Sequence, residues 1–181
     1  MDNIIDNSAF YGKLLIPNAN EETGVTGIVV KKFIDENQEY FLRNILGNEL
    51  YEDFAASYDG MDDTSRWYAV LNGVTFKPSN YCPSIRWFGL PFVLARYVYC
   101  EYQKNEVTQS VDGGEVITDT QNAGRAYVVA KFSDAWNVMA RQLSVLKEYM
   151  DIEFKDDEDW QLQSSALQGS QFLTTINPFG I

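Results

Sequence analysis

The side chains that could carry chemistry in this chain are mostly carboxylates, because its 181 residues include no histidine. Without histidine, the chain cannot form a Ser-His-Asp triad, a His-ligated zinc site or a His general base. Two cysteines are present, Cys82 and Cys100, but a Cys nucleophile would lack its usual His partner. The sequence also lacks the glycine-rich patterns that cradle phosphates in nucleotide-binding proteins.

One run of carboxylates, "DDED" at Asp156–Asp159, could attract a divalent cation. It lacks the alternating spacing and the glycine of a calcium loop, and a short acidic run is usually a solvated face. A hydrolase that uses a pair of carboxylates stays open as an alternative, although no spacing favours it. We therefore expect no catalytic residue, no metal site and no cofactor.

The charge balance and the cysteine count limit the environment of the protein. With 26 acidic and 14 basic residues the net charge is −12, which disfavours sequence-independent binding of nucleic acid. Two cysteines are too few for a disulfide framework, and no CxxC spacing suggests zinc. The start of the chain does not look like a signal peptide. The longest apolar run, residues 87–100, is short for a membrane span and contains Arg96. We expect a soluble intracellular protein with no membrane partner.

Hydrophobic periodicity predicts a mainly α protein, a single helical-bundle domain of about five helices with a β-hairpin or extended arm and an extended C-terminal tail. The first helix should end at Gly47, the second should be capped by Asn48, and the third by Asp62 or Asp63. The prolines of residues 74–84 predict a loop there. The apolar face of the first helix is expected to contain Val25, Ile28, Val29, Phe33, Tyr40, Phe41 and Ile45.

Two further helices should form the centre of the bundle. Pro91 suits the first turn of a fourth helix that runs to about Lys104 and is apolar almost all round, which indicates burial. In the fifth helix, apolar residues recur at steps of three and four and predict a seam against the fourth. That seam contains Phe132, Trp136, Met139, Leu143, Leu146 and Met150.

The stretch "NEVTQSVDGGEVITDTQN", residues 105–122, is poor in both core residues and chemistry. Short β-prone runs flank "DGG", so residues 106–120 are expected to form a projecting arm, either a hairpin or an extended loop. Too little apolar surface is available to offset the ordering entropy, so we expect the arm to order mainly against a neighbouring subunit; a mobile surface loop is the alternative. Its expected contact residues are Val107, Val111, Gly113, Gly114, Val116 and Ile117.

The chain is expected to divide into a helical domain, residues 1–155, and an extended C-terminal tail, residues 156–181. The tail shows no sustained period but carries apolar residues, which suggests docking. We expect it to dock on another chain through Phe172, Leu173, Ile176, Phe179 and Ile181.

Several short strings together resemble one family across nearly the whole chain. They are "LIPNA" at 15–19, "FLRNILGNELYEDF" at 41–54, "WFGL" at 87–90, "YVYCEYQKNEVTQS" at 97–110, "QNA" at 121–123, "AWNVM" at 135–139 and the closing "NPFGI". In their order and spacing they look like head–tail connector proteins of tailed phages, as in phages of Bacteroidetes hosts including crAss-like phages. Within this set Trp87, Gly89, Leu90 and Trp136 are read as fold markers in the core and not as a site.

The resemblance implies a structural virion protein that forms a ring in the phage neck, beneath the portal and above the tail. Such rings are commonly twelvefold, and their partners are copies of the same chain, the portal protein and other neck or tail proteins. Genomic DNA passes through without specific binding, and the acidic charge would resist adhesion. The resemblance transfers no catalytic residue, so we expect no enzyme. The alternatives are a monomeric helical adaptor or regulator, and a small enzyme that uses carboxylates and a metal.

Overall fold

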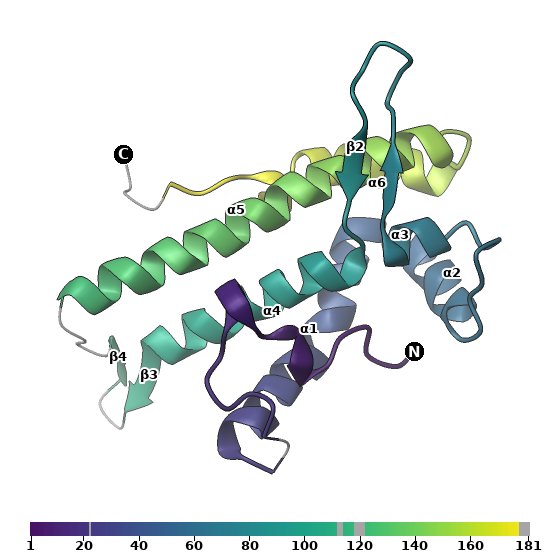
Figure 1. The fold of residues 1–181 in the computed structure, drawn as a ribbon. Helices are drawn as coiled ribbons and strands as arrows, with labels where there is room; N and C mark the ends of the chain where they lie inside the picture. Colours follow the sequence, from purple (N-terminus) through teal and green to yellow (C-terminus); the bar gives the residue numbers. More distant parts are fainter. Residues whose placement is uncertain (22, 112–113, 118–121, 178–181) are drawn as a thin grey trace.

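The computed structural model describes the backbone of residues 1–21, 23–111, 114–117 and 122–177, and their side chains except those of residues 106–128. This part of the chain is mainly α-helical, as predicted, with six α-helices and two small antiparallel sheets of two strands each. The helices are α1 (Val25–Leu46), α2 (Asn48–Tyr58), α3 (Tyr68–Asn72), α4 (Leu90–Val107), α5 (Asn122–Glu153) and α6 (Glu158–Gln168). Figure 1 shows α4 and α5 side by side, with the β3–β4 sheet at the end of α4 and the β1–β2 hairpin rising from the body.

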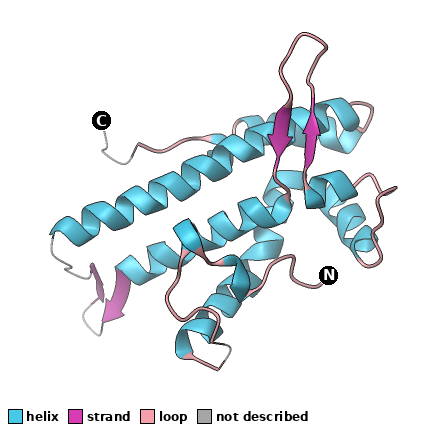
Figure 2. Ribbon diagram, viewed as in Figure 1, coloured by secondary structure: helices cyan, strands magenta, loops and turns pink. Residues whose placement is uncertain are grey.

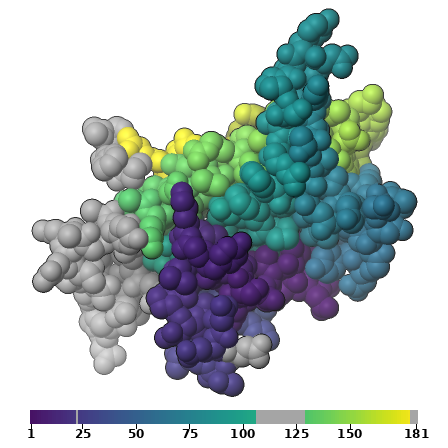
Figure 3. Space-filling model, viewed as in Figure 1, coloured from purple at the N-terminus to yellow at the C-terminus, as the bar shows by residue number. Residues whose placement is uncertain are grey.

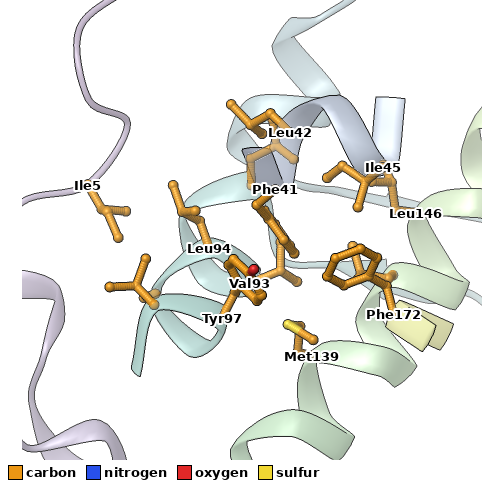
Figure 4. Packing of buried hydrophobic residues seen from close by; sticks show 14 of the residues in the cluster. Ile5, Phe41, Leu42, Ile45, Val93, Leu94, Tyr97, Met139, Leu146 and Phe172 are labelled. Atoms are coloured by element: carbon orange, nitrogen blue, oxygen red, sulfur yellow. The ribbon is translucent and has the colours of Figure 1, made fainter. Parts of the chain in front are cut away.

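Helix α4 lies at the centre of the bundle and packs mainly against α5 and α1. Val93, Leu94 and Val98 of α4 have no exposed surface, which confirms the expectation that this helix is buried on most sides. Along α5, the predicted seam is buried from Met139 to Met150. Figure 4 shows Met139 and Leu146 of α5 together with Val93 and Leu94 of α4 in this core.

The apolar face predicted for α1 is only partly correct. Val25 and Ile28 are exposed, whereas Val30, Ile34 and Phe41 face the core. The buried stripe also contains Gln38, and its side chain binds the N-terminal segment: Oε1 accepts from the Ile4 N–H at 2.6 Å, and Nε2 donates to the Asp2 carbonyl at 3.3 Å. This glutamine interrupts the apolar pattern of the buried face in the sequence, but both polar atoms of its amide are hydrogen-bonded in the fold.

Residues 1–20 contain two 3-10 turns: η1 (Asn7–Ala9) packs against α1, and η2 (Gly12–Leu14) packs against α4 and α5. Asn7 connects the N-terminal segment to α1, because its Nδ2 donates both to the Ala19 carbonyl, at 2.8 Å, and to the Gly27 carbonyl of the helix, at 3.0 Å. A side chain at Gly27 would lie 2.2 Å from the Glu21 carbonyl oxygen, so the segment and the helix can approach this closely only at glycine.

The helix ends agree with the sequence better than the helix starts. Gly47 and Gly73 end α1 and α3 with φ near +84° and +89°, a backbone region that favours glycine. Asn48, however, is the first residue of α2 and does not cap it. Asp62 caps a turn instead of a helix, since its carboxylate accepts from the Thr64 N–H and hydroxyl, and α3 begins only at Tyr68.

The loop predicted for residues 74–84 is wrong only at its start, because residues 74–76 form strand β1 (Val74–Phe76), which pairs with β2 (Ile85–Trp87) directly after the loop. In this hairpin Val74 pairs with Trp87, Thr75 with Arg86 and Phe76 with Ile85. The prolines lie only in the connection between the strands. They are excluded from a sheet interior but tolerated in such a connection.

The extended tail predicted for residues 156–181 is also wrong over its first half. Residues 158–168 form α6, which packs against α1, α5 and α2. Asp157 caps this helix by accepting from the Trp160 N–H at 3.2 Å, and the acidic residues Glu158 and Asp159 occupy its first turn. Negative charge at a helix N-terminus is stabilising, so the acidic run that suggested a solvated tail marks a helix start.

Candidate interaction surfaces

Residues 170–176 fold onto their own subunit, contrary to the prediction that they dock on another chain. After η3 (Gln171–Leu173) the chain lies along α5, and Phe172 is only 2% exposed. The Phe172 ring meets the rings of Phe41 and Tyr97 edge-on, both at 5.7 Å between centroids, and stacks on Trp136 at 6.4 Å. Figure 4 shows Phe172 among core side chains of α1, α4 and α5. Phe172 therefore completes the core of its own subunit.

Hydrogen bonds from α5 hold the backbone of this segment. Asn137 pairs with Ile176 in both directions: Nδ2 donates to the carbonyl at 2.8 Å, and Oδ1 accepts from the N–H at 2.7 Å. The residue before Asn137 also takes part, since Trp136 Nε1 donates to the Thr174 carbonyl at 2.8 Å. The Asn137 side chain thus makes the two hydrogen bonds to the Ile176 backbone that a neighbouring β-strand would make in a sheet.

Leu173 and Ile176, two of the other expected tail contacts, also pack against the subunit's own core. Phe179 and Ile181 lie outside the described residues. The correction therefore concerns residues 170–176, and the motif "AWNVM" is explained by its contacts with the C-terminal segment.

The predicted arm is a hairpin in its backbone, β3 (Thr108–Val111) paired with β4 (Gly114–Ile117). Thr108 pairs with Ile117, and Val111 with Gly114, so Gly114 belongs to a strand and not to the turn. Val107 is the last residue of α4. Gly113 lies outside the described residues, and so do the side chains of Val107, Val111, Val116 and Ile117. The expectation that this arm orders on assembly stays a prediction.

The β1–β2 hairpin, which sequence reasoning missed, projects from the body. Figures 1 and 2 show it rising away from the helices, and Figure 3 shows its connecting loop standing clear of the body surface. Tyr81 in this loop is 100% exposed. A turn closes the tip, in which the Cys82 N–H donates to the Ser79 carbonyl at 3.1 Å. The alternation in "VTF" and "IRW" was the sequence signal that could have revealed the strands.

The root of this hairpin is fixed in the core. Trp87 is fully buried, and its Nε1 donates to the Val70 carbonyl at 2.8 Å. Gly73 and Gly89 bring two backbone segments together: a side chain at Gly89 would lie 2.5 Å from the Leu71 carbonyl oxygen. Leu90 is also fully buried. All four residues that were predicted from the sequence to lie in the core are buried in the structure. They are Trp87, Gly89, Leu90 and Trp136.

The root is also joined to α5. Gln142 accepts from the Phe88 N–H through Oε1 at 3.1 Å and donates from Nε2 to the Arg86 carbonyl at 3.4 Å. The ring of Phe76 in β1 meets Tyr149 edge-on at 5.3 Å between centroids. A two-stranded hairpin is marginal alone, so these contacts explain why a short one can form here.

No family model, curated protein or solved structure matches this chain.

Asp157 of the acidic run is engaged in structure together with Asp53, which lies outside the run. Arg66 donates to Asp53 through Nε and Nη2 and to Asp157 through Nη1 at 3.0 Å, which joins α2 to α6. Burial alone would raise the pKa of Asp53, but hydrogen bonds from Trp67 and Arg66 outweigh it and lower the pKa below its ordinary value. Such a carboxylate is a poor general acid and a good ion-pair partner.

Asp151 at the end of α5 has a similar structural role toward α6. Its carboxylate accepts from Trp160 Nε1 at 3.0 Å, from the Ser164 hydroxyl at 2.7 Å and from Lys147 Nζ at 2.7 Å. Burial acts to raise its pKa, but the bonds from Lys147 and Ser164 lower it overall. Among the residues that the structure describes, no group of three or more His, Cys, Asp or Glu side chains is placed to hold a metal ion.

The cysteines differ in environment. Cys100 is buried in α4, and burial raises the pKa of its thiol to about 12. Cys82 is exposed at the hairpin tip. A thiol with so high a pKa is a weak nucleophile at neutral pH, so Cys100 is a core residue.

In the described part of the chain, the structure has no helix with the length and apolar character that a membrane crossing requires.

Proposed function

We propose that this chain is a structural subunit of a ring in the neck of a tailed phage, between the portal and the tail, where it gives DNA a passage without catalysis. The proposed partners are further copies of the chain, the portal protein and other neck or tail proteins. The proposed place of action is the virion, after assembly in the bacterial host.

The observation that carries this proposal is the presence of two hairpins at separate places on one helical body. The β1–β2 hairpin adjoins the start of α4, and β3 follows its end. Helix α4 has 18 residues, so the two hairpins are separated by roughly 27 Å along its axis. Figure 2 shows both hairpins at the margin. A closed ring requires two different contact surfaces on each subunit, and projections at two separate places support such an arrangement.

The placement of the resembling strings supports the same proposal. "FLRNILGNELYEDF" forms the corner between α1 and α2, "WFGL" the root of the β1–β2 hairpin, and "AWNVM" the part of α5 that holds the C-terminal segment. These strings lie where elements connect or pack together, which fits a family whose members act through their shape and assembly and not through catalysis. The net charge of −12 suits a passage through which DNA must slide, because a negative surface repels the DNA phosphates.

The proposal is tested by measuring the mass of the native protein, alone and with a portal protein, and by imaging the assemblies. We expect closed rings of several copies, either alone or on the portal. A chain that stays monomeric under both conditions would contradict the ring and favour the monomeric adaptor. An image of the virion neck would test the proposed location directly.

The arm at residues 106–120 gives a second measurement. We expect fast amide hydrogen exchange there in the monomer and slow exchange in the ring, because pairing with a neighbour would supply the burial that the arm lacks alone. Strong protection in an isolated monomer would show that ordering does not depend on assembly.

A further inference from the structure

The segment around the β1–β2 hairpin has a charge opposite to that of the rest of the chain. Residues 64–100 contain four basic residues and no acidic residue. The other 144 residues hold all 26 acidic residues and only 10 of the 14 basic ones. The projecting hairpin is thus a positive feature on an otherwise strongly negative protein.

Two of the four basic residues lie on the hairpin itself. Lys77 follows β1, and Arg86 lies in β2 opposite Thr75, whose hydroxyl accepts from Arg86 Nη1 at 3.1 Å. Both side chains are exposed, and within the described residues neither has a carboxylate partner. Thr75 and Arg86 alternate with Val74, Phe76, Ile85 and Trp87, so the polar pair points away from the face that packs on the body.

The tip adds an aromatic residue to this charge. Tyr81 is fully exposed, and the loop that carries it is closed by the bond from the Cys82 N–H to the Ser79 carbonyl. Tyrosine and arginine are enriched at the centres of protein interfaces. A rigid root, two unpaired cations and an exposed tyrosine together describe a preorganised contact element.

We propose that the β1–β2 hairpin is a docking arm that binds an acidic surface of a second copy of this chain. This inference rests on the proposed ring, because it names one of the two surfaces that a ring subunit must offer. Charge complementarity selects the occupant: the hairpin is positive, and the rest of each copy carries a large excess of acid.

The acidic end of α5 is the counter-surface that the structure offers. Glu153 at the end of α5 and Asp156 just beyond it are exposed, and among the described residues neither carboxylate has a basic partner. The neighbouring carboxylates Asp151 and Asp157, in contrast, already form ion pairs with Lys147 and Arg66, respectively. Glu153 and Asp156 therefore remain available to cations from another copy.

Reciprocal charge reversal tests the pairing. The first variant carries Lys77→Glu and Arg86→Glu, the second carries Glu153→Lys and Asp156→Lys, and the third combines all four changes. The two lysines should be tolerated in the fold, because positive charge suits a helix C-terminus. The matched control for the first variant is Lys31→Glu with Lys32→Glu, which changes the net charge by the same amount but on α1.

We expect the first and second variants each to weaken assembly about tenfold or more, the third to recover it, and the control to assemble like wild type. Assembly is measured by sedimentation and native mass at several protein concentrations, and helix content by circular dichroism. Rising salt should weaken wild-type assembly, since such contacts are screened.

Each opposing outcome has a distinct meaning. If wild type forms rings and the hairpin variant does so equally well, the docking arm is wrong and the ring stands. If wild type stays monomeric, alone and with a portal protein, both proposals fail. If the hairpin variant assembles normally but loses binding to a labelled DNA duplex that wild type binds, the hairpin contacts DNA phosphates and the copy-to-copy contact is overturned.

Discussion

The C-terminal segment, residues 170–176, and the tip of the β1–β2 hairpin both lie outside the long helices, but only the C-terminal segment packs onto the bundle. Phe172 is 2% exposed in the aromatic cluster, whereas Tyr81 at the hairpin tip is fully exposed. Both residues are aromatic, so the presence of a ring does not by itself decide burial. The backbone does: Asn137 and Trp136 bond the C-terminal segment to α5, while the tip of the hairpin bonds to itself.

The difference shows how an irregular segment becomes part of a core. A buried backbone without hydrogen-bond partners is costly, so a chain with no regular period can be buried only where other groups satisfy it. Helix α5 provides such groups beside Phe172 and provides none at Tyr81. The C-terminal segment is therefore buried because polar side chains of α5 bind its backbone, and the hairpin tip projects where the described part of α5 offers it no such side chain.

Truncation after Gly169 should have the largest effect on this contrast. It removes Phe172 together with the backbone bonds to Asn137 and Trp136, and deletion of one buried Phe side chain alone costs about 3–5 kcal/mol. We expect at least that loss in the free energy of unfolding, measured by urea denaturation. Truncation after Asn177, which keeps residues 170–176, is the control. A near-wild-type stability after Gly169 would mean that the segment does not complete its own subunit.

Trp136→Ala should follow, with a loss of about 3–5 kcal/mol, because the indole is 7% exposed and stacks on Phe172. Trp136→Phe separates the two roles of this side chain. It keeps a stacked ring but removes the bond to the Thr174 carbonyl, for about 0.5–1.5 kcal/mol. Equal losses in the two variants would assign the whole effect to that hydrogen bond.

Asn137→Ala should cost about 1–3 kcal/mol, because it leaves the N–H and the carbonyl of Ile176 without their partner. Hydrogen exchange at Ile176 should accelerate in the same variant. Asn80→Ala in the hairpin loop is a matched control, and we expect a change within about 0.5 kcal/mol. Similar values for the two asparagines would remove the distinction between the regions.

Acid should weaken α6 while leaving the hairpin tip unaffected. Asp53 and Asp151 have pKa values lowered below the ordinary 3.8, so their contribution to stability is complete above that value. It is lost as pH falls through the lower folded-state pKa, that is, below about pH 4. Hydrogen exchange of α6, followed from neutral to acidic pH, should show this. Asp151→Asn should reduce the pH dependence, and an unchanged pH profile would exclude Asp151 as its source.

Tyr81→Ala should have the smallest effect on the subunit, within about 0.5 kcal/mol, because the ring has no protein neighbour to lose. Trp87→Ala at the root of the same hairpin should cost about 3–5 kcal/mol. Thermal unfolding of the two variants measures this division between tip and root. A large loss for Tyr81→Ala would show that the tip is part of the fold.

The sequence was informative where one helix face or one helix end decides the outcome. Pro91 and the apolar residues after it correctly predicted a buried α4, and Gly47 correctly ended α1. The burial of Phe172 could not be predicted, because its partners Phe41 and Tyr97 are distant in sequence. The strands of the β1–β2 hairpin have three residues each, so their alternation was the one available signal, and the two prolines between them outweighed it. For α6, the signal was present in Asp157 and the acidic first turn, but the same residues fit a solvated charge run.

The contact between Gly73 and Gly89 has a practical consequence for redesign of this chain. Because the two glycines hold the ends of residues 74–88 together at the body, the length of the loop beyond the strands has little influence on the bundle. Foreign peptides inserted between Asn80 and Tyr81 should therefore be displayed on a folded carrier. Exposed Cys82 beside them would accept a single dye or cross-linker, since Cys100 is enclosed. The hairpin is thus a natural grafting site.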